Sequence, residues 1–172
     1  MEVIDIRLVT IQPVEILSEL IKNQYYICNP VKTEVLEDSC FRNAYEWMTK
    51  QMAEFVGPAP CGVKYPIWAW YRHDDDYGYW NHDGKVYAKI TLEVDDERVL
   101  LSDFDDWHCV LNNCPVEEDD EEGEYATEAE VRATWKRIFH ADGETVQATF
   151  WELYADDVLN IEIFTSTTEE SE

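Results

Sequence analysis

Alternation of apolar and polar positions predicts two of the strands of this chain. Residues 3–9 and 86–94 alternate with a period of two, which is typical of a strand with one buried face. Residues 65–71 are rich in aromatic side chains and are expected to form a strand rather than a linker. The predicted strands and extended segments are residues 3–9, 25–28, 65–71, 86–94, 99–101, 145–153 and 158–165.

Apolar residues three and four positions apart predict the helices. The clearest helix begins at a cap provided by Asp38 or Ser39 and ends at Gly57, which Pro58 follows. Its apolar face consists of Phe41, Ala44, Tyr45, Met48, Met52 and Phe55.

Three further helices are expected. Pro13 suits the first turn of a helix, because the N–H that proline lacks is unpaired at that position. Ser102 with Asp105 matches the spacing of a capping box, which predicts a helix that begins at Ser102. Thr127 with Glu130 matches the same spacing and predicts another.

The order of these elements, β-α-β-α-β-β-β-α-α-β-β, indicates the α+β class. We expect a single domain with a mainly antiparallel sheet of about five to six strands, flanked by about four helices. The strands on either side of residues 73–85 are expected to form a hairpin, because Asp83 followed by Gly84 is a turn signal. The domain is expected to span residues 1–167, with an acidic loop near residues 115–126, and residues 168–172 to form an acidic C-terminal tail.

The charge balance narrows the choice of partners. The chain carries 38 Asp and Glu against 13 Lys and Arg, for a formal net charge of −25. Neutralising phosphates requires a basic surface, so direct binding to nucleic acid is not expected. The favoured partners are cations and basic or nucleic-acid-binding proteins. Solubility alone is an alternative reason for charge of this size.

The cysteines favour a reducing cytosol, because they are odd in number, scattered and not preceded by a recognisable secretory signal. No run approaches the roughly 18 apolar residues of a membrane span, so no membrane partner is expected. His108-Cys109 with Cys114 lacks a second ligand pair at zinc spacing, and neither a metal nor a cofactor is expected. The cysteines are Cys28, Cys40, Cys61, Cys109 and Cys114.

Five segments, in order along the chain, carry a family resemblance. They are Thr10-Ile11-Gln12-Pro13; Phe41 with Ala44-Tyr45-Glu46-Trp47-Met48; Tyr65-Pro66-Ile67-Trp68-Ala69-Trp70-Tyr71; Val99-Leu100-Leu101-Ser102-Asp103-Phe104-Asp105 with Trp107-His108 and Val110-Leu111-Asn112; and Gln147-Ala148-Thr149-Phe150-Trp151-Glu152-Leu153. Together they resemble a bacterial and phage family, domain of unknown function 3841. The resemblance implies a single compact domain, and it supplies no catalytic residues. Together with the scattered cysteines, it favours the cytoplasm of a bacterial host cell.

Two acidic segments outside these five are candidate partner-binding sites. Carboxylates along an extended chain advance by about 3.3 Å per residue, close to the roughly 3.4 Å spacing of phosphates along a DNA strand. The first hypothesis is therefore an acidic binding or inhibitor protein, of phage or mobile-element origin, that occupies a basic nucleic-acid-binding surface. A CRISPR effector is one candidate target, and a solvated loop is the alternative interpretation. The candidate residues are Asp74, Asp75, Asp76, Glu117, Glu118, Asp119, Asp120, Glu121 and Glu122.

The aromatic strands support a second hypothesis, an enzyme that acts on nucleotides or RNA. Trp68 and Trp70 can line a nucleotide pocket together with Gln12, Gln147 and Glu152. An early polar residue, an aromatic residue and a late Gln or Glu resemble the layout of ADP-ribosyltransferases, which use such residues around NAD. Burial of these aromatic residues in the core is the alternative interpretation.

The histidines add a further form of the enzyme hypothesis, a small nuclease that uses one of them as a general acid or base. Two of the four lie in an Asp-rich loop whose carboxylates are of the type that binds Ca²⁺ or Mg²⁺. That loop lacks the spacing of a calcium loop and its final Glu, so a solvated loop is favoured. The histidines are His73, His82, His108 and His140.

Overall fold

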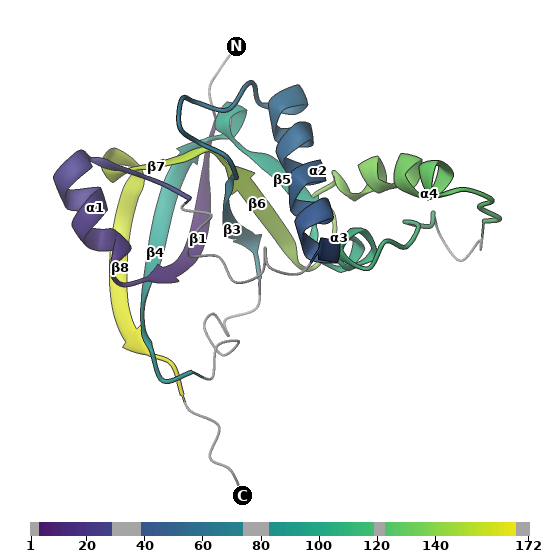
Figure 1. Cartoon of the computed structure of the whole chain (residues 1–172). Helices are drawn as coiled ribbons and strands as arrows, with labels where there is room; N and C mark the ends of the chain where they lie inside the picture. Colours follow the sequence, from purple (N-terminus) through teal and green to yellow (C-terminus); the bar gives the residue numbers. More distant parts are fainter. Residues whose placement is uncertain (1–3, 29–38, 74–82, 119–122, 168–172) are drawn as a thin grey trace, which may run out of the picture.

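Six strands form one antiparallel sheet in the computed structural model, which describes residues 4–28, 39–73, 83–118 and 123–167. The strand order is β5-β6-β3-β1-β4-β8, and a separate two-stranded sheet pairs β2 with β7 (Figure 1). The strands are β1 (Asp5–Pro13), β2 (Tyr25–Ile27), β3 (Ile67–Arg72), β4 (Val86–Asp95), β5 (Leu100–Asp103), β6 (Val146–Phe150), β7 (Glu152–Tyr154) and β8 (Val158–Thr165).

The large sheet has two halves that meet at β1. Along its whole length β1 pairs with β4, from Asp5 opposite Asp95 to Pro13 opposite Tyr87. With β3, by contrast, β1 is in register at a single pair, Val9 opposite Trp70. The halves β5-β6-β3 and β1-β4-β8 therefore meet where only one residue pair is in register.

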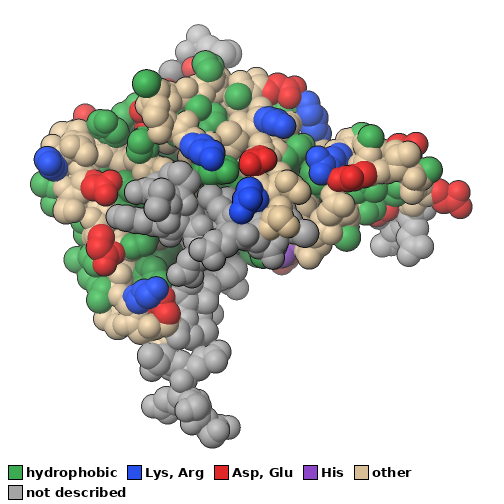
Figure 2. Space-filling model, viewed as in Figure 1, with side chains coloured by type: hydrophobic (Ala, Val, Ile, Leu, Met, Phe, Trp, Pro, Cys, Tyr) green, Lys and Arg blue, Asp and Glu red, His purple; other side chains and the backbone are tan. Residues whose placement is uncertain are grey.

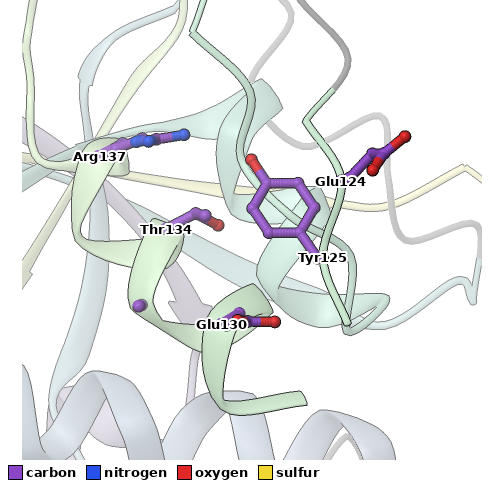
Figure 3. A pocket seen from close by; sticks show the side chains of 6 residues that line it. Glu124, Tyr125, Glu130, Thr134 and Arg137 are labelled. Carbon is purple, nitrogen blue, oxygen red and sulfur yellow. The ribbon is translucent and has the colours of Figure 1, made fainter. Parts of the chain in front are cut away.

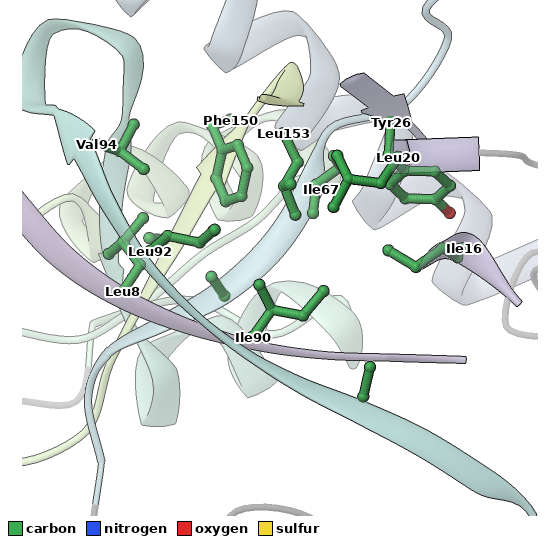
Figure 4. Close-up of a cluster of buried hydrophobic side chains, with 13 residues drawn as sticks. Leu8, Ile16, Leu20, Tyr26, Ile67, Ile90, Leu92, Val94, Phe150 and Leu153 are labelled. Carbon is green, nitrogen blue, oxygen red and sulfur yellow. The ribbon is translucent and has the colours of Figure 1, made fainter. Parts of the chain in front are cut away.

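One face of the sheet is covered by α1 and by the β2-β7 pair (Figure 4). Alternation places Leu8 of β1 and Leu92 of β4 opposite each other on this face, and both are fully buried. Leu20 of α1 and Leu153 of β7 pack against the same cluster. Burial of these apolar side chains is the main force that holds this layer to the sheet.

The other face is covered by α2, α3 and the segment that follows α4. Met48 and Met52 of α2 are fully buried there and pack in one cluster with Trp107 of α3 and Trp135. Figure 1 shows α4 projecting to one side of the sheet. The helices in the described ranges are α1 (Ile16–Asn23), α2 (Ser39–Phe55), α3 (Phe104–Leu111) and α4 (Glu128–Thr134).

The predicted α+β class and mainly antiparallel sheet are confirmed. Helix α2 and strand β4 occur where periodicity placed them. The capping box at the start of α4 is present, since the Thr127 hydroxyl accepts from the Glu130 N–H and the Glu130 carboxylate accepts from the Thr127 N–H. These predictions held because each rests on a period or a cap spacing that is local to its element.

Three local predictions were wrong. Pro13 does not open a helix but is the last residue of β1, because the whole strand is paired with β4. The cap of α3 is Asp103, whose carboxylate accepts from the Asp106 N–H, whereas Ser102 lies in β5. Strands β3 and β4 do not form a hairpin, because β1 lies between them.

No helix in the described part of the chain is both long and apolar enough to cross a membrane. Cys28, Cys61, Cys109 and Cys114 are free thiols, and the side chain of Cys40 lies outside the described set.

Candidate functional site

A row of polar and aromatic side chains crosses β5, β6 and β3 on the face covered by α2 and α3. Ser102 lies opposite Gln147, and Gln147 lies opposite Trp70. One step along the strands, Thr149 of β6 lies opposite Trp68. Because side chains two positions apart in a strand point to the same face, Trp68 and Trp70 share this surface with Ser102 and Gln147.

Three buried polar atoms in this row have no hydrogen-bond partner within the described ranges: Trp68 Nε1, Ser102 Oγ and Gln147 Nε2. Ser102 is fully buried and Gln147 is 4% exposed. By contrast, the Thr149 hydroxyl between them donates to Leu100 O at 3.3 Å. A buried donor without an acceptor costs about 1–3 kcal/mol, and native structures contain few of them. Three such atoms on adjacent strands make this row a candidate binding site, and a fourth unpaired buried atom of the described ranges, Gln51 Oε1 of α2, is an acceptor.

The chemistry of the three groups specifies that atom. An indole N–H and an amide NH₂ can only donate hydrogen bonds, and a hydroxyl can donate or accept. Trp68 Nε1, Gln147 Nε2 and Ser102 Oγ together therefore favour an acceptor, such as the oxygen of a carbonyl or carboxamide.

Aromatic rings lie over and beside this row. The Trp68 ring contacts Trp107 at a centroid distance of 4.9 Å and Tyr45 at 5.4 Å. Burial is the main cause that raises the pKa of Tyr45, and the nearby Cys28 adds to it. The phenol of Tyr45 is therefore a hydrogen-bond donor over the whole physiological range.

A second aromatic group surrounds Trp70. The centroid of the Trp70 ring lies 4.9 Å from that of Phe104 and 4.4 Å from that of His73, and the Phe104 and His108 centroids are 4.6 Å apart. Trp68 and Trp70 are only half-buried, so these rings reach from the buried donors toward the surface. Flat, partly exposed rings beside buried donors suit a planar ligand.

Two other residues predicted for a nucleotide pocket lie apart from this row. Gln12 is on β1, where alternation from Val9 places it on the opposite face, and its Nε2 donates to Thr10 Oγ1 at 2.9 Å. Thr10 Oγ1 in turn donates to Trp68 O at 2.7 Å, so Gln12 supports the junction between β1 and β3. Glu152 is in the second sheet, on β7, where its carboxylate accepts from the Tyr154 hydroxyl.

Of the acidic residues predicted to bind a partner, only Glu117 and Glu118 lie within the described ranges. Glu117 accepts hydrogen bonds from the Gly123 N–H and the Tyr125 hydroxyl, and Glu118 forms an ion pair with Arg137 at 3.3 Å. These two carboxylates are therefore held by local partners. The other predicted partner-binding residues lie outside the described ranges: Asp74, Asp75, Asp76, Asp119, Asp120, Glu121 and Glu122.

A shallow hollow of about 350 Å³ lies beside this segment, lined by Tyr125, Glu130, Thr134 and Arg137 among others (Figure 3). Three of the polar residues that line it, Glu130, Thr134 and Arg137, have internal partners. Glu130 caps α4, Thr134 Oγ1 accepts from the Val116 N–H at 2.8 Å, and Arg137 donates to Val116 O at 2.8 Å. The bonds to Val116 hold the segment before the acidic run against α4 and the turn that follows it. We therefore interpret the hollow as a packing boundary between these segments rather than a binding site.

A cluster of charged residues that the sequence did not predict lies at the N-terminus of α3. One ligand-type atom from each of Asp103, Asp106 and His140 lies within 4.8 Å of the others. His140 Nε2 is 2.9 Å from Asp106 Oδ2, and its Nδ1 is bonded to Asp142. These residue types can hold a metal ion, but both ring nitrogens already face carboxylates. The arrangement is that of an imidazolium between two acids.

The hydrogen bond to Asp106 is the main cause that raises the pKa of His140, which Asp142 raises further. Arg72 donates to the carbonyls of Ala141 and Gly143 at 3.0 and 2.6 Å, so it fastens β3 to the same turn. Spacing could not reveal this cluster, because Asp106 and His140 are 34 residues apart. Of the remaining histidines, His73 and His108 border the aromatic row, and His82 lies outside the described ranges.

The chain was compared with curated proteins, solved structures and protein-family models, and one family model matches it. No curated protein and no solved structure matches the chain. One family model, domain of unknown function DUF3841, matches residues 7–129, from β1 to the start of α4. The match covers Trp68, Trp70 and Ser102, includes the acidic run at residues 117–122, and ends before Gln147. Since the model covers most of the chain, the protein belongs to the DUF3841 family.

Proposed function

We propose that this protein binds a nucleotide on the face of the β5-β6-β3 half-sheet, in the cytoplasm of a bacterial host. The observation that carries the proposal is the set of three unpaired buried donors, Trp68 Nε1, Ser102 Oγ and Gln147 Nε2. A ligand that accepts from them supplies hydrogen bonds that these buried groups do not form within the described ranges.

The ligand's ring is the part that these residues recognise. A flat heterocycle bearing a carbonyl or carboxamide oxygen presents the acceptor that the donors require, and it can stack against Trp68, Trp70 or Phe104. The nicotinamide ring of NAD has this form. NAD is therefore the first ligand to test, although of the polar residues in the ADP-ribosyltransferase-like layout only Gln147 lies in this row.

Transfer of ADP-ribose from NAD is the reaction that such a site would support. Glycosyl transfer passes through a positively charged, oxocarbenium-like transition state, which a neighbouring carboxylate stabilises. Position 147 carries a neutral amide, which orients a ligand but gives less stabilisation of that charge. Nucleotide binding is accordingly the core of the proposal, and transferase activity is its extension.

The test is calorimetric titration of the purified protein with NAD, compared between two variants that each lose one buried hydroxyl. Ser102→Ala removes an unpaired hydroxyl at the site and should weaken NAD binding several-fold. Thr134, the last residue of α4, is 4% exposed, and its hydroxyl both donates and accepts a hydrogen bond, so Thr134→Ala should leave NAD affinity unchanged. Absence of NAD binding by the unsubstituted protein, or equal affinities of both variants, would contradict the proposal.

The catalytic extension has a separate readout. Incubation with labelled NAD, with and without host protein or RNA, measures transfer or hydrolysis. Gln147→Glu exchanges one of the three donors for a carboxylate, so it should weaken NAD binding but increase the cleavage rate of bound NAD if the ring binds where we propose. The double variant Gln147→Glu/Ser102→Ala is the control. If the increase in cleavage does not depend on binding at this face, adding Ser102→Ala should reduce cleavage only slightly.

A second candidate function is docking on a basic or nucleic-acid-binding protein, and the distribution of charge favours it. The net charge is −25, and several of the few cations are already paired with acids. Figure 2 shows Lys and Arg side chains lying beside Asp and Glu on one face. Acids therefore remain in large excess over the cations that could neutralise them, which supports attraction to a basic surface.

Capture of partners from a bacterial host lysate tests the docking function. Binding should fall steeply with salt, because surface charges are screened within about 10 Å at 0.1 M ionic strength. Replacing residues 117–122 by Gln and Asn should weaken it as well. Capture that persists through both changes would remove this candidate.

A further inference from the structure

Among the described residues, the strand β8 has a neighbouring strand on one side only. It is the terminal strand in the order β5-β6-β3-β1-β4-β8, and in Figure 1 it lies at the outer left of the sheet. It pairs with β4 along one side, regularly from Val86 opposite Thr165 to Thr91 opposite Asn160. An edge strand presents a row of backbone N–H and C=O groups on its other side, ready to pair with another strand.

From Asn160 to Thr165 this edge carries few of the devices by which proteins usually block such pairing, and the register shift with β4 lies before Asn160. Natural edge strands carry prolines, lysines or inward-pointing charges, but Glu162 is the sole charged residue of β8. It is balanced across the ladder by Lys89, at an N–O distance of 3.7 Å. Ile161 and Ile163 are 40% and 61% exposed, and they point to the same face.

We propose that β8 pairs with β8 of a second copy of this chain, antiparallel across a two-fold axis, so that the two sheets become continuous. A two-fold interface must be self-complementary. With the axis at Ile163, this residue faces its own counterpart, Ile161 faces Thr165 of the other copy, and Glu162 faces Phe164 of the other copy. The two Glu162 side chains are thus not directly opposite each other. An axis at Glu162 would place these two negative charges face to face.

Charge complementarity selects a second copy over a basic peptide. A basic strand is drawn to an acidic edge, whereas β8 is locally neutral, since Glu162 and Lys89 balance each other. A neutral strand with β-branched residues at alternate positions is the matching occupant, and β8 itself has that sequence. The proposal does not depend on nucleotide binding.

Sedimentation velocity of the full chain over a range of concentrations tests the proposal. We expect a monomer–dimer equilibrium whose dimer fraction increases with salt, because salt screens the repulsion between two chains of charge −25. Docking on a basic partner has the opposite salt dependence, so the two interactions are distinguishable. A protein that stays monomeric at all concentrations and salt levels would overturn the proposal.

Two variants identify the interface. Ile163→Lys places two cations against each other at the axis and should lower dimer affinity at least tenfold. Ile21→Lys is the matched control, because Ile21 is also exposed, at 74%, but lies on α1. The dimer affinity of this variant should equal that of the parent. Hydrogen exchange of the unsubstituted chain gives an independent measure, since β8 amides should become more protected as concentration rises. A dimer unaffected by Ile163→Lys, or β8 protection independent of concentration, would place the interface elsewhere and refute this one.

Discussion

Ser102 lies directly opposite Gln147 across the β5-β6 ladder, and neither Ser102 Oγ nor Gln147 Nε2 has a hydrogen-bond partner within the described ranges. Two buried polar groups on facing strands could have been replaced by apolar residues without loss of packing. The proposed ligand would give both groups a partner, and such exceptions to optimal stability are expected at functional sites.

Ser102→Ala is therefore expected to affect stability and binding in opposite directions. Removing an unpaired buried hydroxyl should leave the free energy of unfolding unchanged or raise it by about 1 kcal/mol, while NAD binding weakens. Urea unfolding and calorimetry measure the two effects. A loss of stability of about 1 kcal/mol or more would show that the hydroxyl is satisfied in the native protein.

Thr10→Val tests the junction between the two halves of the sheet. The Thr10 hydroxyl is fully buried and donates to Trp68 O at 2.7 Å, across a boundary with a single pair in register. Valine has nearly the same shape, so the change removes the hydrogen bond and should cost about 1–2 kcal/mol of unfolding free energy. The half-buried Thr91→Val on β4 is the control and should stay within about 0.5 kcal/mol of the parent.

Thr127→Ala should destabilise α4. The hydroxyl caps the helix and forms one half of a capping box, so its loss is expected to cost about 1 kcal/mol. Thr49→Ala, in the middle of α2, is the comparison, because Thr49 bonds to the Tyr45 carbonyl within an intact helix and alanine has the higher helix propensity. Equal costs for the two changes in urea unfolding would argue against a capping role for Thr127.

His140 should make stability depend on pH. Its pKa is raised in the folded protein, first by Asp106, so the protonated form is the stabilising one. Its contribution is complete below the unfolded pKa of about 6.5, and it is lost as pH rises through the higher folded value. Stability measured from pH 5 to pH 9 should therefore show a decline above about pH 6.5 that His140→Gln removes.

Asp142→Asn is the companion variant, because it removes one of the two carboxylates that hold the imidazolium. It should reduce the pH-dependent part without abolishing it, since Asp106 remains as the larger cause. Identical pH profiles of the parent and of His140→Gln would rule out the ion-pair cluster as a source of stability.

Helices and strands with strong periodicity could be predicted from the sequence. The apolar repeat of α2 and the alternation of β4 require only the residues of the element itself. The error at Ser102 has a physical cause. Ser102 and Asp103 are both good helix caps in isolation, and pairing of β5 with β6 placed Ser102 in the strand and left the cap to Asp103.

The candidate site was predictable in part for a similar reason. Trp68, Trp70 and Gln147 could be proposed as neighbours because they lie on strongly patterned strands, and the ladder between β3 and β6 does bring them together. Glu152 was grouped with them by proximity in sequence, but the chain leaves β6 at Phe150 and enters a different sheet. Ser102 was missed as a site residue because its neighbours on other strands cannot be read from local spacing.

The sequence by itself determined the α+β class, the capping box of α4 and the acidity of the chain, because each depends on residue types or on spacings of a few positions. Tertiary structure alone decided that β1 lies between β3 and β4, that Ser102 faces Gln147, and that His140 reaches Asp106. These relationships join residues far apart in sequence, and they depend on which strand orders bury the most apolar surface. The grouping of the three unpaired donors also depends on tertiary structure, because Trp68, Ser102 and Gln147 are brought together only by pairing of β5, β6 and β3.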